Sequence, residues 1–502
     1  MHLSRRGLLM TAAALPLIPR PTWAQAKDSL IMGLSSYPPN IDPFLHGGTA
    51  AGTVKLCIFR GLTSFAESGS VQPELAESFE PETETTWVFR LRDALFHDGS
   101  PVTAEDVKWT IETVAAETST AYMRSEFQTV TSVETPDAKT VRITTATPTV
   151  TLPLWFANFN MPIIKKDSLE NPIGAGPFTL KNQDRGVAID LEAFDRFYKP
   201  GLPKLRSIRM VAYADENLRV AALQTGDVDL IEYVPWQSMA AIEGDSALRL
   251  TTTNGPFMGL GFNGARGPFA DPKVRQAAAF AINRQDIVDA VFFGRGAPLE
   301  SIPYEVDGPF FNEDLSTHWR YDPDKAMALL AEAGMDGGFE CTLLSTSQYG
   351  MHKTTAEIVQ QYLAQVNIAV TLNMPDWATR QALGGRGQYD ILIDGTTAES
   401  PDPDGLAPIL DSTLSPSSSR SYGIPATRLH ELFVQGRAEF DQDKRKAIYR
   451  DLELELHQIV TKCGLAWRSQ GYAMRANLDG FANLPGSLTF YSGRTLETTS
   501  FA

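Results

Sequence analysis

Cysteine is scarce in this chain, with three residues, Cys57, Cys341 and Cys463, among 502. Because the number is odd and the three lie far apart in the sequence, at most one disulfide can form and at least one thiol stays free. No C-x-x-C motif occurs. A chain of this length can bury a large apolar core, so we expect a fold that does not depend on a disulfide, even in an oxidising compartment.

Histidine is also sparse, and the seven copies are scattered, so the sequence contains no readable cluster of metal ligands. His430 and Glu431 begin the H-E-x-x-H zinc motif, but position 434 is valine. The segment 400–411 has part of the spacing of a calcium loop, but three prolines interrupt it and its first position carries no acid. We therefore predict that the protein has no metal site of its own.

Enzyme and cofactor motifs are missing as well, since neither G-x-S-x-G nor a P-loop is present. The segment 259–264 has the G-x-G-x-x-G spacing of a dinucleotide site, but residues 265–268 do not begin the helix that this motif requires. We predict no cofactor and no enzymatic activity. An exported hydrolase whose carboxylates come together only in the folded chain remains an alternative.

Basic residues are outnumbered, with 44 Lys and Arg against 60 Asp and Glu and a net charge of -16. This balance argues against nucleic acid or an anionic membrane surface as a partner, because both favour a basic face.

The N-terminus also lacks a hydrophobic run long enough to cross a membrane. The apolar run at residues 7–18 is about a dozen residues long, whereas a membrane-spanning helix needs about twenty.

The N-terminal run has the surroundings of an export signal. Arg5 and Arg6 precede it, and Arg20 and a small-residue site at 24–26 follow it, which is typical of a twin-arginine signal peptide cleaved after Ala26. Cleavage would leave 502 - 26 = 476 residues with a net charge of -19, because three arginines are removed. No cysteine lies near the site to carry a lipid, so we expect a freely soluble periplasmic protein.

The most informative stretch of the mature chain is 75–112. Trp87, Phe89 and Leu91 alternate with more polar residues, which predicts a half-buried strand. After a turn, Thr103 and Asp106 have the spacing of a capping box that opens a helix. A composition of 43% hydrophobic and 21% charged residues is typical of a globular chain of this length with two or three lobes.

The sequence of this stretch also resembles that of a known family. "LAESFE" at 75–80 and "FRLRDALFHDGSPVTAEDV" at 89–107 are similar to the extracellular solute-binding proteins of ABC importers, family 5, the dipeptide, oligopeptide and nickel group. Further segments similar to this family occur at 174–178, 218–230, 268–294, 321–334 and 389–410. The resemblance implies an α/β periplasmic-binding-protein type II fold of the large three-lobed class, with two main lobes joined by a two-segment hinge.

Lobe boundaries follow from the same resemblance. It implies lobe I at 27–70, 170–255 and 470–502, an additional small lobe at 71–169, and lobe II at 256–469, with crossings near 254–263 and 465–470. Closure about such a hinge needs only a few residues to change backbone conformation. Local signals within the lobes predict a helix near 218–226 with Leu218, Ala221 and Ala222 on its apolar side and Gly226 at its end. They also predict helices beginning at Asp271-Pro272 and at Asn283.

Candidate ligand-binding residues come from both lobes. Ser36 and Tyr37 follow the first strand in a loop that lies along the cleft in the family. Glu399 corresponds to the acid that binds the ligand's ammonium group in peptide-binding members, and Thr396 replaces the family's tryptophan. By residue type alone, Arg380 or Arg386 is a candidate partner for a ligand carboxylate. Trp377 and Trp467 are candidates for an aromatic wall, with core packing as the alternative for each.

The resemblance predicts a monomeric receptor that captures a small solute between its lobes and delivers it to an ABC permease with its ATPases. A peptide or peptide-like solute is the first reading, although the glutamate at 399 and the threonine at 396 depart from the peptide binders. Opines, metal chelates and oligosaccharides are alternatives for the ligand. A ligand sensor or chaperone is an alternative of another class.

Overall fold

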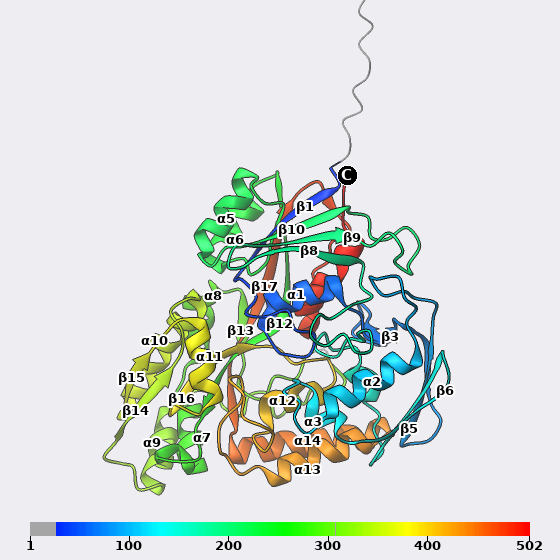
Figure 1. The fold of residues 1–502 in the computed structure, drawn as a ribbon. Helices are drawn as coiled ribbons and strands as arrows, with labels where there is room; N and C mark the ends of the chain where they lie inside the picture. The colour runs from blue at the N-terminus through cyan, green and yellow to red at the C-terminus, as the bar shows by residue number, and fades with distance from the viewer. Residues whose placement is uncertain (1–26, 307) are drawn as a thin grey trace, which may run out of the picture.

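A computed structural model describes residues 27–306 and 308–502, so the predicted signal peptide lies outside the described residues. The names lobe I, small lobe and lobe II denote the residue ranges predicted from the sequence. In Figure 1, lobe I lies at the top, lobe II at the lower left and along the bottom, and the small lobe at the lower right. No helix in the described part of the chain combines the length and apolarity that crossing a membrane requires.

One mixed sheet of eleven strands runs through both main lobes, in the order β15-β14-β16-β12-β17-β11-β1-β10-β9-β8, with β13 paired to β17. Lobe I contributes β1 (Ser29–Leu34), β8 (Phe178–Asp184), β9 (Ala188–Ala193), β10 (Ser207–Ala212) and β11 (Leu230–Ile231). Lobe II contributes β13 (Gly296–Pro298), β14 (Phe339–Leu344), β15 (Ile368–Asn373) and β16 (Ile391–Thr396).

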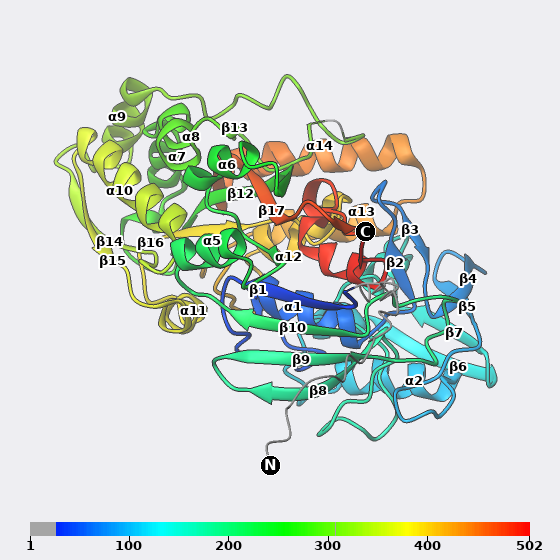
Figure 2. The same ribbon diagram turned by 90° about the horizontal axis from the view of Figure 1, so that it is seen from above.

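Two long antiparallel strands, β12 (Leu248–Phe262) and β17 (Lys462–Arg475), connect the lobes. Their register runs from Leu248 opposite Arg475 to Gly261 opposite Lys462, with an irregularity between Asn254 and Phe257. Figure 2 shows both strands at the centre of the molecule. The segments expected to cross between lobes, 254–263 and 465–470, lie on these strands, so the two crossings are paired to each other.

Most of the helices are divided between the two main lobes. Lobe I has α1 (Gly48–Ile58), α5 (Glu216–Thr225), α6 (Trp236–Glu243) and the 3-10 helix η3 (Gly486–Glu497). Lobe II has η1 (Pro268–Ala270), α7 (Pro272–Phe280), α8 (Arg284–Phe292), α9 (Pro323–Glu332), α10 (Gly350–Gln365), α11 (Trp377–Gly385), η2 (Pro403–Leu406), α12 (Ala407–Leu410), α13 (Thr427–Ala438) and α14 (Gln442–Ile459).

The small lobe is built on a separate four-stranded antiparallel sheet, ordered β4-β5-β7-β6. Its elements are β4 (Ala76–Pro81), β5 (Thr86–Leu91), α2 (Ala104–Ala115), α3 (Arg124–Phe127), β6 (Val130–Asp137), β7 (Thr140–Thr145) and α4 (Leu152–Trp155). Short pairs β2 (Thr63–Phe65) with β3 (Val71–Pro73), and β18 (Leu478–Asp479) with β19 (Ser500–Phe501), complete the fold.

Local sequence signals place the starts of α2, α7 and α8 correctly. The Thr103–Asp106 capping box opens α2, and Trp87, Phe89 and Leu91 are buried on β5 as predicted. Asp271 caps α7 with Pro272 at its first position, and Asn283 caps α8. The apolar side predicted for α5 is right at Ala222, which is buried, but wrong at Leu218 and Ala221, which are exposed. Leu218 is 63% exposed, and Val220 and Leu223 are buried instead. The helix does end at Gly226, which has a φ of 86°.

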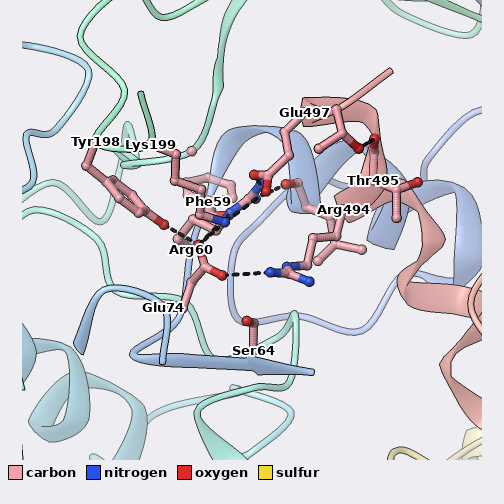
Figure 3. A network of polar contacts seen from close by, with 12 residues as sticks. Phe59, Arg60, Ser64, Glu74, Tyr198, Lys199, Arg494, Thr495 and Glu497 are labelled. Atoms are coloured by element: carbon pink, nitrogen blue, oxygen red, sulfur yellow. Dashed lines mark hydrogen bonds and ion pairs between the residues drawn. The ribbon is translucent and has the colours of Figure 1, made fainter. Parts of the chain in front are cut away.

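A buried ion network fastens the C-terminal segment to lobe I (Figure 3). Arg60 donates to the Glu497 carboxylate at 2.7 Å, and Lys199 lies 2.8 Å from both Glu74 and Glu497. Arg494 lies 3.2 Å from the second oxygen of Glu74. Because these side chains come from four segments that are distant in the sequence, the network ties the C-terminal segment to residues near positions 60, 74 and 199.

All three cysteines are buried free thiols. Burial raises the pKa of Cys57 and of Cys341 to about 12 and that of Cys463 to about 11. Thiols with such pKa values are almost wholly protonated at neutral pH and react slowly.

Candidate functional site

A cavity of about 990 Å³, counted to where it opens to solvent, lies where the lobes meet. Lobe I, the small lobe and lobe II all contribute to its wall. Aromatic rings form much of the wall, namely Tyr122, Phe159, Tyr233, Tyr349, Trp377, Phe490 and Tyr491.

Four of the seven predicted site residues line this cavity: Ser36, Trp377, Thr396 and Glu399. Trp377 is the first residue of α11 and packs edge-on against Tyr349 with ring centroids 5.4 Å apart. Direct ligand contact by these residues stays a prediction. The geometry brings them together because the loop after β1 and the end of β16 face each other across the cleft.

The other three predicted residues lie off the cavity wall. Tyr37 packs against the apolar core of lobe I. Arg380 is fully buried behind the wall and donates to the backbone carbonyls of Ile393 and Ser418 at 2.7 and 2.8 Å. Trp467 is buried edge-on against Phe257 on the β12–β17 ladder. Core packing therefore accounts for both the tyrosine and the tryptophan, and Arg380 supports the wall from behind.

The carboxylate of Glu399 joins lobe II to the small lobe. Tyr122 Oη donates to one of its oxygens and Asn158 Nδ2 to the other, each at 2.8 Å. Burial raises the pKa of Glu399, and these two hydrogen bonds act in the opposite direction. Both oxygens are thus occupied by neutral donors, and the side chain bridges two lobes.

The "DPD" segment at 402–404, next to Glu399, has a structural role. Asp402 makes a two-pronged ion pair with Arg445, at 2.6 and 2.8 Å, and Asp404 accepts from Arg437 at 2.6 Å. Bidentate pairs of this kind hold a loop in a defined geometry. They anchor the loop that carries Glu399 onto α13 and α14.

A second acid on the wall, Asp394, is already neutralised by its own lobe. Lys462 Nζ lies 2.8 Å from one carboxylate oxygen and the Arg380 guanidinium 3.5 Å from the other, and all three side chains are buried. Burial would raise the pKa of Asp394, but these two cations lower it below its usual range. Two cations against one anion leave one excess positive charge behind this part of the wall.

The start of α1 lies on the opposite wall and was not predicted from the sequence. Residues 46–50 line the cavity, and α1 begins at Gly47 and Gly48 without any side-chain cap. Gly48 has a φ of 79°, which favours glycine, and an added Cβ there would meet open space. The sequence shows little sign of this feature, because backbone amides at a helix N-terminus are not marked by a side-chain pattern.

Neighbouring groups fix the position of this wall. Ser35 donates its amide and its hydroxyl to the buried Glu232 carboxylate at 2.9 and 2.8 Å, which holds the loop after β1. The pKa of His46 is lowered to about 4, by desolvation first and then by Lys55, so its imidazole is neutral at pH 7. Within the described part of the chain, no group of three or more His, Cys, Asp or Glu side chains has the geometry of a metal site.

Comparison with known proteins gives one family match. The model of the bacterial extracellular solute-binding proteins, family 5 Middle, matches residues 70–416. The glutathione-binding protein GsiB of Pectobacterium atrosepticum is 27% identical over 508 residues, which cover 97% of this chain and 98% of GsiB. The Escherichia coli K12 GsiB is 28% identical over 499 residues, 96% of each chain.

Solved structures agree with the fold. The periplasmic binding protein AgaA from A. tumefaciens R10, in complex with agropinic acid, superposes with a TM-score of 0.91 at 37% identity over 94% of this chain and 99% of AgaA. DppA from Helicobacter pylori, in complex with the peptide STSA, gives a TM-score of 0.85 at 20% identity over 95% and 98% of the two chains. The second likeness concerns the fold alone.

Proposed function

Because the chain belongs to the bacterial extracellular solute-binding proteins of family 5 and has their type II periplasmic-binding-protein fold, we propose that it is the receptor of an ABC importer for an opine-type acidic solute. In this role the cavity between the lobes captures one solute molecule, the lobes close, and the closed form delivers the solute unaltered to the membrane permease. Export through the twin-arginine signal, a periplasmic location and a monomeric state are parts of the same proposal.

The observation that carries the choice of ligand is the state of the two carboxylates on the cavity wall. Glu399, the counterpart of the ammonium-binding acid of peptide binders, has both oxygens engaged by Tyr122 and Asn158. Asp394 is ion-paired to Lys462. No other Asp or Glu of the described residues lines this cavity. An α-ammonium group entering the cavity would therefore have to share a carboxylate that already has protein donors, which favours an ordinary peptide less than an acidic solute.

The similarity to AgaA supports an opine-type solute. AgaA is 37% identical over nearly the whole chain and was solved with agropinic acid bound. Opines combine acidic and polar groups, and the wall offers the matching kinds of contact. The hydroxyls of Ser36, Thr49 and Ser418 supply hydrogen bonds, and the ring of Trp377 supplies apolar surface.

A peptide-like solute is the second candidate. The GsiB proteins are glutathione-binding proteins and are 27 to 28% identical to this chain over nearly its full length. Glutathione is an acidic tripeptide with an unusual linkage, so it shares negative charge with the opines. The family consists of binding proteins, and we propose no catalysis for this chain.

Closure follows from the position of the cavity. A ligand can favour the closed form only through contacts that differ between the open and the closed state. Residues of lobe I, such as Ser36, and of lobe II, such as Trp377, both line the cavity, so one bound solute could contact both lobes. The paired strands β12 and β17 are the proposed hinge.

Titration calorimetry of the mature chain, residues 27–502, tests the proposal with agropinic acid, mannopinic acid, glutathione and a neutral dipeptide. We expect one or both opines to bind most tightly, and mass spectrometry to recover them unchanged. Binding restricted to dipeptides would overturn the ligand assignment. Chemical conversion of the ligand would overturn the assignment as a transport receptor.

A further inference from the structure

The first turn of α1 presents free backbone amides to the cavity. The amides at the start of any helix cannot be satisfied inside it. No side chain caps α1, and among the described residues no hydrogen bond engages the amides of Gly48, Thr49 and Ala50. Since Gly47 and Gly48 have no side chains, the cavity surface that they provide is backbone. The positive end of the helix dipole therefore lies at the wall.

A second, independent observation comes from the facing lobe. His352 and Thr397 line the same cavity and are 1% and 6% exposed. Nδ1 of His352 and Oγ1 of Thr397 have no hydrogen-bond partner among the described residues. Buried polar atoms are almost always paired, so two orphans on one cavity wall indicate that a bound molecule supplies their partners.

The charges around the cavity favour an anion. Behind lobe II, Arg380 and Lys462 exceed Asp394 by one positive charge. Behind lobe I, Lys55 on α1 bonds the Asn160 amide oxygen at 3.0 Å and the Leu45 carbonyl. Burial lowers the pKa of Lys55 to about 7, so this side chain adds only part of a positive charge at neutral pH. Glu399 is the opposing negative charge on the wall, and Tyr122 and Asn158 hold its carboxylate on the side of the small lobe.

We propose that the acid group of the ligand binds at the N-terminus of α1, where the amides of Gly48, Thr49 and Ala50 donate to its carboxylate. Polar groups next to the acid then pair with His352 and Thr397 across the cleft. This inference rests on the proposed function and makes it more specific: the substrate class is a carboxylic acid that carries further hydrogen-bonding groups. Contacts with both lobes from one end of the solute also couple its recognition to closure.

Two substitutions at Thr49 separate the amide from the side chain. Thr49→Pro removes one amide in the first helical turn, where proline is tolerated. Thr49→Ala removes the side chain and keeps the amide. We expect Thr49→Pro to bind the acid roughly tenfold or more weakly than Thr49→Ala, because the lost bond is a charge-assisted one. Equal affinities of the two variants would overturn the subsite.

A third variant keeps the test sharp if proline disturbs the helix. Thr397→Val replaces the unpartnered hydroxyl with a methyl group of the same shape. If that hydroxyl serves the ligand, the variant binds more weakly, while the ligand-free protein melts at the same or a higher temperature because a buried unpaired group is gone. If the affinity is unchanged and the melting temperature rises, the hydroxyl only destabilises the fold, and its proposed role in ligand binding is wrong.

The probes distinguish this inference from the opine assignment. Each variant is titrated with agropinic acid, mannopinic acid, glutathione and the methyl ester of whichever acid binds best. If glutathione alone binds the wild type, the opine assignment fails, but a selective loss in Thr49→Pro still supports the acid subsite. If the methyl ester binds as tightly as the acid, or only neutral solutes bind, the subsite is overturned whatever the ligand is.

Discussion

Glu399 gives the sharpest contrast between two roles for one carboxylate. If it bridges the lobes through Tyr122 and Asn158, then Glu399→Gln weakens closure for every ligand, because two hydrogen bonds to a charged carboxylate become bonds to a neutral amide. A hydrogen bond to a charged group contributes about 1.5–3 kcal/mol, and water entering the open cleft offsets part of the loss. We therefore expect the affinity to fall by roughly 5- to 50-fold, which corresponds to about 1–2.3 kcal/mol.

A double-mutant cycle with Tyr122→Phe measures the bridge directly. Tyr122→Phe removes one of the two hydrogen bonds and leaves the carboxylate in place. Because both substitutions act on the Tyr122–Glu399 bond, their effects on the binding free energy should overlap by at least about 0.5 kcal/mol. Calorimetry with an acidic and a cationic ligand supplies the numbers. Strictly additive effects, or a loss confined to cationic ligands, would refute the bridge and restore the ammonium-binding role.

The remaining predictions concern stability and access. Asp394→Asn should destabilise the fold by about 3–5 kcal/mol in chemical denaturation, since it leaves two buried cations without their partner; a change below about 1 kcal/mol would contradict the ion triad. Neighbouring cations hold the pKa of Glu74 far below its usual range, so its contribution to stability is complete above about pH 4.5 and is lost as the pH falls. Glu74→Gln should reduce the fall of the melting temperature at acidic pH. An unchanged fall would contradict the proposed contribution of the buried ion network. The three buried thiols should resist a thiol reagent until the protein is denatured, and fast labelling of the native protein would contradict their burial.

Glu399 itself should add a pH dependence of the opposite sign. Burial raises its pKa in the folded protein above the usual value of about 4.5. The folded state then binds more protons, so this group's contribution to stability is highest below pH 4.5 and falls as the pH rises toward the raised pKa. Glu399→Gln should remove that decline from a melting-temperature profile. A decline that persists in the variant would assign it to another group.

Much of the fold was readable from the sequence because local signals and tertiary packing agree there. The capping box at Thr103 and Asp106, and the proline after Asp271, set helix starts wherever they occur. The buried face of α5 was predicted less accurately, because it depends on the sheet against which the helix packs. Leu218 is apolar but points away from that sheet, which periodicity over one short helix cannot reveal.

The site was predictable only in part. The resemblance located Ser36, Thr396 and Glu399 on the cavity wall, but it could not foresee that Tyr122 and Asn158, more than two hundred residues away, occupy the Glu399 carboxylate. Residue type alone suggested Arg380 as a ligand contact, although burial places it behind the wall. The start of α1 went unnoticed because backbone amides leave little trace in a side-chain pattern.

The most direct test of the account is calorimetric titration of residues 27–502 with agropinic acid and with a neutral dipeptide in parallel, followed by mass spectrometry of the released solute. The account predicts that the acid binds with a micromolar or lower Kd, binds more tightly than the dipeptide and is recovered intact. A dipeptide that binds more tightly than every acid tested, or a solute that emerges chemically changed, would contradict it.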